Sequence, residues 1–162
     1  MQKKLEKKIN GKLLIGRNEW TSLPDLSVPA IKAKIDTGAK TSSLHAVNIK
    51  KIKRSGRVYV KYDVYPIQNN DEVIVSCQSR VIDERFIMSS NGHKEHRCVI
   101  STTLCLGDQM WPIEISLADR DALRYKMLLG REALSQCTLI DPGASCCQGR
   151  VSKNMLRALY NF

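Results

Sequence analysis

The stretch Ile31-Lys32-Ala33-Lys34-Ile35-Asp36-Thr37-Gly38-Ala39-Lys40-Thr41 decides the fold. Apolar residues alternate with lysines as far as Ile35, which is the two-residue period of a half-buried strand. The pattern then stops at a carboxylate, a hydroxyl and a glycine. An acid placed where a strand gives way to a glycine turn is held rigidly and still reaches the surface. We therefore expect Asp36 to do chemistry. The alternative is a turn-capping aspartate, because Asp and Gly are common in turns.

The residues around Asp36 resemble a known family. Asp36-Thr37-Gly38-Ala39 resembles the active-site loop of aspartic proteases, and its continuation through Lys40-Thr41-Ser42-Ser43-Leu44-His45-Ala46 resembles a retropepsin-like family. That family is catalogued as ATP-dependent zinc proteases and is often found beside ATP-grasp glutamate ligases. Lys126-Met127-Leu128-Leu129-Gly130-Arg131-Glu132-Ala133-Leu134 is similar to the second retropepsin signature, an apolar strand that ends at glycine and continues into a short helix. The resemblance runs from about Leu13 to Ser145, with both motifs in the family's order.

The resemblance implies a role for each matching residue. Asp36 is the catalytic acid, Thr37 bonds across to the loop of a partner subunit, and Gly38 lets the substrate backbone lie close. The residues implied to contact substrate are Ala39, Lys40 and the flap turn Ser89, Ser90, Asn91 and Gly92. The residues implied to support the site are Leu129, Gly130 and Arg131, with Gly130 allowing two backbones to approach closely.

Lys40 departs from the pattern of the viral retropepsins. Those enzymes carry an acid shortly after the motif, and it pairs with the arginine of the Gly-Arg step. Because the chain has Lys40 in this region, Arg131 needs another partner. The spacer between the two motifs is also longer than in the viral enzymes, so its loop geometry cannot be transferred.

Aspartic proteolysis needs two carboxylates about 3 Å apart that share one proton. The chain has one Asp-Thr-Gly, and no internal repeat is visible. The lookalike Asp141-Pro142-Gly143 has proline where the hydroxyl and the N–H are needed. We therefore expect a two-fold symmetric homodimer with Asp36 from each subunit at the axis. Ala39 cannot donate a side-chain hydrogen bond to the carboxylate, so we expect the dyad to work nearer neutral pH.

Alternating apolar and β-branched residues over several short segments predict a mainly β fold. The expected strands include 28–35, 57–65, 72–77 and a hairpin of 81–88 with 95–103, whereas 21–26 is expected to be a loop. Helix is expected only over 132–135 and 152–159, the latter with Met155, Leu156 and Leu159 on one side. The resemblance sharpens this to a small closed β barrel of the retropepsin-like acid protease type, with one or two short helices.

The 162 residues fit one domain. We expect a flexible basic lead-in over 1–12, the β domain over 13–145 and a tail over 146–162 that could be helical. No apolar run approaches the roughly twenty residues of a membrane helix, and the N-terminus lacks the apolar centre of a signal peptide. These features favour a cytoplasmic protein. The six cysteines form no Cys-x-x-Cys pair and are expected to be reduced.

Lysine and arginine outnumber acids by 26 to 16, which gives a net charge of +10. The excess is spread along the chain without aromatic interleaving, so nucleic acid is not the expected partner. An acidic, glutamate-rich or polyglutamylated protein tail is a plausible substrate, since family members lie near glutamate ligases. The side chains that could line an acid-attracting groove are Lys34, Lys40, His45, Lys50, Lys51 and Arg54. The alternative is a retropepsin-fold module that binds acidic peptide or nucleic acid without cutting.

No metal or other cofactor is expected. His93 and His96 stand near Cys98, but residues three apart on a strand face opposite sides, so a shared zinc site would need a bend. The chain has no His-Glu-x-x-His and no phosphate-binding Gly-x-x-x-x-Gly-Lys-Ser/Thr loop. A zinc-dependent protease therefore remains the lesser alternative.

Overall fold

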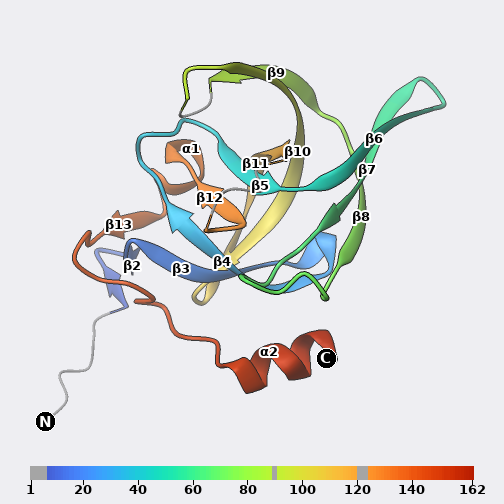
Figure 1. Ribbon diagram of the computed structural model, residues 1–162. Coiled ribbons are helices and arrows are strands. Elements are labelled where there is room, and N and C mark those ends of the chain that lie inside the picture. The colour runs from blue at the N-terminus through green and yellow to red at the C-terminus, as the bar shows by residue number, and fades with distance from the viewer. Residues whose placement is uncertain (1–6, 89–90, 120–123) are drawn as a thin grey trace, which may run out of the picture.

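A computed structural model of the chain describes residues 7–88, 91–119 and 124–162, and its architecture is mainly β (Figure 1). The expected fold class is confirmed at this level. The elements in chain order are β1 (Lys8–Ile9), β2 (Lys12–Ile15), β3 (Asn18–Leu23), η1 (Pro24–Leu26), β4 (Val28–Ile35), β5 (Ser42–His45), β6 (Val47–Arg54), β7 (Arg57–Val64), β8 (Val75–Arg80), β9 (Asp83–Met88), β10 (Lys94–Leu106), β11 (Gln109–Ala118), β12 (Met127–Leu129), α1 (Arg131–Leu134), β13 (Thr138–Ile140) and α2 (Lys153–Tyr160).

The central sheet is a ring of strand pairings. Its order is β11-β5-β12-β4-β3-β10, and β10 pairs again with β11, while β9 extends the sheet from β10. Two small sheets, β1-β2-β13 and β6-β7-β8, adjoin it. The fully buried side chains inside are large and apolar, and include Ile15, Ile31, Leu44, Leu104, Ile115 and Leu129. Burying each such side chain contributes about 1.5–3 kcal/mol.

Most of the expected strands form where apolar residues occupy alternate positions of the sequence. The strand over 28–35 is confirmed as β4, and the hairpin is confirmed by the pairing of Lys94 with Met88 and of Val99 with Asp83. The expected loop over 21–26 is wrong, because β3 runs from Asn18 to Leu23. Its inward-facing positions include the polar Glu19 and Thr21, which hide the period of two.

The expected strand over 72–77 begins too early. The structure has β8 from Val75 to Arg80. The Asn70 side chain accepts hydrogen bonds from the backbone N–H groups of Glu72 and Val73, at 2.8 and 3.2 Å. This Asx-type turn satisfies backbone donors that would otherwise be free to enter a strand ladder.

Part of the segment expected as a lead-in is structured, since Lys8 and Ile9 pair with Leu13 and Lys12. At the other end, the expected helix is confirmed as α2, and Ser152 caps it by accepting a hydrogen bond from the Met155 N–H at 3.1 Å. Of the three apolar residues expected on one side, only Leu156 is buried; Met155 and Leu159 are exposed. None of the helices among the described residues could span a membrane.

Both parts of the 146–162 segment contact β strands. The Tyr160 hydroxyl bonds the backbone of Ala30, and burial raises the pKa of Tyr160 to about 12. Upstream, the fully buried Glu19 carboxylate accepts three backbone N–H groups: Gly16 at 3.2 Å, Cys147 at 2.8 Å and Gln148 at 2.7 Å. A buried charge persists only when it is satisfied in this way, so Glu19 fastens the chain after Cys146 to β3.

Candidate active site

Two parallel strands deliver the acid loop. β4 pairs with β12, with Ile35 opposite Leu129, and the Asp36 N–H donates to the Leu129 carbonyl at 2.9 Å. The chain then turns, and the Gly38 N–H donates to Oδ1 of Asp36 at 3.0 Å. Asp36 is half-buried, and its Oδ2 has no hydrogen bond to any described residue. One carboxylate oxygen is thus fixed by the backbone while the other is available to water or to a second acid.

Gly130 lies directly against the acid loop. A Cβ on Gly130 would lie 2.8 Å from the Ala39 carbonyl oxygen and 2.9 Å from that of Lys40. Those two carbonyls accept the N–H groups of Arg131 at 2.8 Å and Glu132 at 3.2 Å, which open α1. The proposed reason for a glycine at this position, a close approach of two backbones, matches this geometry.

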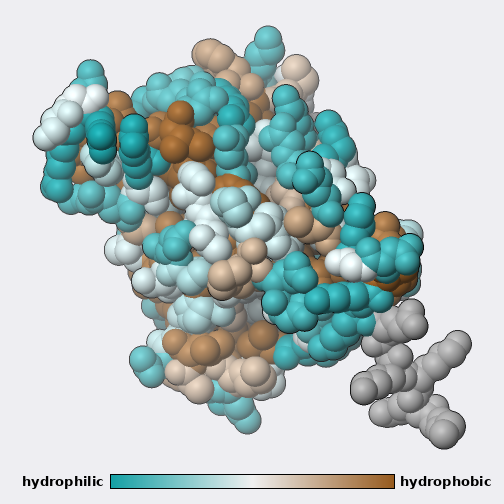
Figure 2. Space-filling view, turned by 180° about the vertical axis from the view of Figure 1, so that it is seen from behind, coloured by the Kyte–Doolittle hydropathy of each residue, from teal (hydrophilic) through white to brown (hydrophobic). Residues whose placement is uncertain are grey.

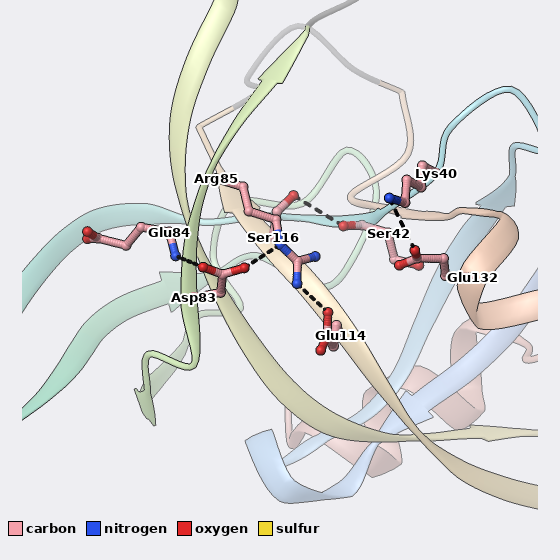
Figure 3. A network of polar contacts seen from close by, with 8 residues as sticks. All are labelled: Lys40, Ser42, Asp83, Glu84, Arg85, Glu114, Ser116 and Glu132. Carbon is pink, nitrogen blue, oxygen red and sulfur yellow. Dashed lines mark hydrogen bonds and ion pairs between the residues drawn. The ribbon is translucent and has the colours of Figure 1, made fainter.

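Two serine hydroxyls form hydrogen bonds next to the contact between Gly130 and the acid loop. The Gly130 N–H donates to Ser42 Oγ at 3.0 Å, and Ser116 Oγ donates to the Ser42 carbonyl at 3.1 Å. Both serines are buried, and Figure 3 shows them beside the charged residues of the site. The hydroxyls therefore satisfy backbone groups that burial would otherwise leave unpaired.

Arg131 binds a backbone carbonyl. Its Nη1 donates to the Thr37 carbonyl oxygen at 2.9 Å, so the arginine holds the turn that contains Asp36. Lys40 lies 3.7 Å from Glu132, and both side chains are exposed. The acid that pairs with the arginine in viral enzymes is therefore replaced here by a main-chain acceptor. Thr37 itself is exposed.

A second loop repeats the backbone pattern of the acid loop. Asp141 accepts the Gly143 N–H on Oδ1 at 2.9 Å, and its own N–H donates to the Ile15 carbonyl at 2.8 Å. Arg17 N–H donates to the Ala144 carbonyl at 2.8 Å, as Arg131 N–H does to Ala39, and Gly16 lies against Ala144 as Gly130 lies against Ala39.

The expectation that the chain has no internal repeat is thus wrong for local structure. Leu14-Ile15-Gly16-Arg17 corresponds to Leu128-Leu129-Gly130-Arg131, and Asp141-Pro142-Gly143-Ala144 corresponds to Asp36-Thr37-Gly38-Ala39. Along the chain both copies run in the same order, Leu-x-Gly-Arg before Asp-x-Gly-Ala, but with different spacing, and each glycine lies against the Asp loop of the other copy. The second loop has proline in place of Thr37 and lacks its hydroxyl.

A cavity of about 700 Å³ begins two residues after Asp36. Its walls are the acid loop, β9, and one residue each from β11 and α1. The lining residues are Gly38, Ala39, Lys40, Thr41, Arg85, Phe86, Ile87, Met88, Glu114 and Glu132. Of the residues expected to contact substrate, Ala39 and Lys40 line this cavity. Ser89 and Ser90 lie outside the described residues, and Asn91 and Gly92 are exposed in the turn after β9.

Arg85 is the best-fixed cation of the cavity and was not among the expected site residues. Its guanidinium donates to Asp83 Oδ2 and Glu114 Oε2, each at 2.6 Å (Figure 3). The bond from Arg85 lowers the pKa of Asp83. Next to it, Phe86 and Met88 are 74% and 63% exposed, so β9 offers apolar side chains beside a neutralised cation. The alternation of Arg85 and Ile87 with Phe86 and Met88 predicts a two-faced strand, but nothing in the sequence says which face meets a cavity.

Of the six side chains expected to line an acid-attracting groove, only Lys40 lines this cavity. His45 is buried, and Lys51 bonds Glu84 at 2.5 Å. Lys50 and Arg54 lie on β6. The expectation of one groove lined by all six is therefore wrong, because the six residues lie on three different strands and a loop. Among the described residues, no group of three or more His, Cys, Asp or Glu is placed to hold a metal ion.

A family model described as RimB-like, retropepsin-like aspartic endopeptidase RimB, matches residues 14–151. The chain belongs to this family. It is also 48% identical over 151 residues to a protein of Shewanella pealeana named "Probable alpha-L-glutamate ligase", and 44% identical over 149 residues to a protein of the same name from Parasynechococcus marenigrum. These matches cover 93% and 92% of the chain but only 33% and 32% of the relatives. The chain thus spans about a third of the length of the curated relatives that it matches.

A solved structure is also similar. The Legionella pneumophila protein Lpg0085, of unknown function, superposes with a TM-score of 0.68 at 29% identity, covering 83% of this chain and 97% of that one. The glutamate-ligase name carried by the relatives agrees with the expected association of this RimB-like family with glutamate ligases.

Proposed function

We propose that this RimB-like chain is an aspartic endopeptidase that acts as a homodimer, with Asp36 of each copy at the shared active site. The observation that carries the proposal is the environment of Asp36. Its Oδ1 accepts the Gly38 N–H, its Oδ2 has no hydrogen bond to the described residues, and a cavity begins at Gly38. The family match, whose name is that of an aspartic endopeptidase, supports the reaction class. The proposal includes the expected fold, in which the ring of strands is the closed barrel of the acid proteases.

The reaction follows from two carboxyl groups sharing one proton. One Asp36 carboxylate takes a proton from a water molecule, and the water oxygen bonds to the scissile carbonyl carbon. The other Asp36, protonated, donates its proton to the carbonyl oxygen. Collapse of the tetrahedral intermediate breaks the C–N bond, and the amine leaves with a proton from the dyad. Thr37 is exposed next to the acid, and in this proposal its hydroxyl bonds across the subunit boundary.

A second copy is required because a lone carboxylate cannot complete this proton cycle. Asp141 does not supply the missing acid: its Oδ1 accepts the Gly143 N–H in a separate loop that pairs with β2 rather than with β12. We infer a two-fold dimer in which the exposed faces of the two Asp36 loops meet.

The substrate proposed is a peptide or protein tail rich in glutamate. Lys40, 74% exposed and only 3.7 Å from Glu132 in an open ion pair, is free to exchange Glu132 for a substrate carboxylate. Phe86 and Met88 would cover the apolar stems of the substrate side chains. The glutamate-ligase name of the relatives supports a functional link between this chain and a ligase that adds glutamates.

The test is cleavage of glutamate-rich peptides, followed by mass spectrometry. Asp36→Asn should abolish cleavage while leaving folding unchanged. Asp141→Asn is the matched control, since it makes the same change in a loop with the same hydrogen bonds, and it should retain cleavage. Cleavage retained by Asp36→Asn and abolished by a chelator would favour the zinc-dependent alternative.

Substrate preference is tested separately. Replacing glutamate by glutamine in the peptides should slow cleavage, and raising salt should slow it further. Equal rates for both peptides at all salt concentrations would reject the acidic substrate while leaving the peptidase intact. Failure of the chain to form dimers at micromolar concentration in sedimentation, together with no cleavage, would favour the non-catalytic binding module.

A further inference from the structure

The sheet β6-β7-β8 lies away from the proposed active-site loop and carries many cations. Its β6–β7 hairpin projects from the body, and mostly hydrophilic side chains gather over it at the upper left of Figure 2 (Figures 1 and 2). Ser55 and Gly56, with φ of 49° and 74°, form the two-residue turn at its tip. The three strands contain the cations Lys50, Lys51, Lys53, Arg54, Arg57, Lys61 and Arg80, against the single carboxylate Asp63.

The register separates this sheet into two faces. Val60, Tyr62 and Val64 are buried against the core, so the alternate residues of β7 face away from it. Directly paired residues share a face, which places Arg54 beside Arg57, Lys50 beside Lys61, and both Ile52 and Arg80 beside Tyr59. We call this set the outer face of the sheet: Lys50, Ile52, Arg54, Arg57, Tyr59, Lys61 and Arg80.

The five cations of the outer face have no anionic partner among the described residues. All five are exposed, and the ion pairs of the described chain involve other cations, such as Lys51 with Glu84. Asp63 follows the same alternation of β7 and also faces outward, but it lies at the base of the sheet, where its carboxylate accepts hydrogen bonds from the Asn48 and Ser76 side chains at 2.9 and 2.8 Å. Like charges placed side by side cost stability, so an uncompensated set of this kind favours a polyanion.

The spacing fits a single nucleic-acid strand. Same-face residues along a strand are about 6.7 Å apart and neighbouring strands about 4.8 Å apart, so the cations form a two-dimensional grid on the scale of successive phosphates. Tyr59, half-buried between Ile52 and Arg80, presents the aromatic platform on which a base can stack. A sheet with a central aromatic residue and flanking Arg and Lys is a common arrangement for binding unstacked bases.

We propose that the outer face of β6-β7-β8 binds single-stranded nucleic acid. The cations hold the phosphates, and Tyr59 stacks on a base. Composition alone argues against a nucleic-acid partner, because the cations are dispersed in the sequence. Strand pairing, however, brings five of them together around the ring of Tyr59. An acidic peptide would use the same cations, but it has no group that needs the ring. The proposal does not depend on Asp36, so it stands or falls apart from the peptidase.

The test is fluorescence anisotropy with a labelled oligouridine of about 12 nucleotides, a length within the range of single-strand binding sites. The protein carries Asp36→Asn so that the measurement is independent of any cleavage. Affinity should fall steeply between about 50 and 200 mM KCl, with a log–log slope near −3.5 if all five cations contact phosphates. Unlabelled polyglutamate of equal charge serves as the competitor.

Two pairs of variants separate charge from stacking. Arg54→Ser with Arg57→Ser should make the slope shallower by about 1.4, whereas Arg150→Ser with Lys153→Ser removes equal charge near α2 and should leave it unchanged. Tyr59→Leu should weaken oligouridine binding by about fivefold or more, whereas Tyr59→Phe, which keeps the ring, should not. Circular dichroism checks that each variant is folded.

Three outcomes would overturn the proposal. The first is no binding of oligouridine at 50 mM KCl. The second is equal loss in the Arg54/Arg57 variant and its control, which would mean a diffuse charge effect. The third is polyglutamate displacing oligouridine at equal concentration with no effect of Tyr59→Leu, which would identify the outer face as a site for acidic peptide.

Discussion

Gly130 shows how a single residue fixes the geometry of the acid loop. Its backbone lies against the carbonyls of Ala39 and Lys40, and the Ser42 hydroxyl accepts its N–H. Any side chain would force the two backbones apart by several tenths of an ångström. Because the Asp36 N–H is bonded to Leu129, the residue before Gly130, that displacement would reach the Asp36 carboxylate.

Gly130→Ala should therefore impair both folding and cleavage. The added Cβ meets backbone rather than a flexible side chain, so a loss of about 1–3 kcal/mol is expected, as for overpacking elsewhere in protein interiors. Urea denaturation measures the loss, and peptide cleavage measures the effect on the site. Gly56→Ala is the control: its Cβ meets open space and its cost of about 1–2 kcal/mol comes only from positive φ, with no effect on cleavage. Full activity in Gly130→Ala would show that the close approach is not needed.

Site residues that belong to a sequence motif can be predicted from the sequence, whereas those outside a motif cannot. Asp36 and Gly130 were expected to adjoin, and their loops do. The partner of Arg131 cannot be predicted, because a backbone carbonyl, here that of Thr37, has no sequence signature. Arg85 cannot be found in this way either, since one of the two carboxylates that hold it, Glu114, lies 29 residues away on another strand.

Among the elements, β3 carries a buried side chain, Glu19, that links distant parts of the chain. Glu19 is fully buried on it and joins residues 16, 147 and 148, so it connects the start of the chain to the segment before α2. Both carboxylate oxygens accept hydrogen bonds, and all three donors are backbone N–H groups.

Glu19→Gln should destabilise the protein by about 3 kcal/mol, because the amide NH₂ must face at least one N–H that then has no acceptor. Equilibrium urea denaturation checks the value, and limited proteolysis should reveal earlier cleavage in the segment after Cys146. Glu72→Gln, the same change at an exposed position, should alter stability by less than about 0.5 kcal/mol. Equal stability of the two variants would contradict the role given to Glu19.

The same residue explains what the sequence could not reveal about elements. β4 and β7 have apolar alternation and were located well, whereas β3 has Glu19 and Thr21 at inward positions. The closing of the ring depends on pairings between segments distant in the chain, β3 with β10, β5 with β11 and β4 with β12, which local periodicity does not report. Asp141-Pro142-Gly143 resembles the acid loop in sequence, but only its hydrogen bonds reveal that it has the same local structure.

At the scale of the whole molecule, ordered surface carboxylates set the response to acid. Hydrogen bonds lower the pKa of Asp25 (from Thr103), Asp63 (from Asn48 and Ser76), Asp83 (from Arg85) and Glu84 (from Lys51). In the unfolded chain these groups titrate at their ordinary values of 3.8 and 4.5. Near pH 4 the unfolded chain therefore binds more protons than the folded one.

Stability should be fully present above about pH 5 and fall as the pH drops through 4 towards the folded-state pKa values. Denaturation in urea at a series of pH values measures this dependence. Asp63→Asn removes one of the four groups and should flatten the acid limb. A free energy of unfolding that stays constant from pH 6 to pH 3 would contradict the assignment of these hydrogen bonds.

The proposed enzyme is a property of two chains, and subunit mixing tests that claim most directly. Wild-type and Asp36→Asn chains are refolded together in varied ratios at constant total concentration, and peptide cleavage is measured at each ratio. If each site takes one Asp36 from each subunit, activity should fall as the square of the wild-type fraction, so an equal mixture retains about a quarter. Activity that falls in simple proportion to the wild-type fraction would show that each chain works alone, and would contradict the shared dyad.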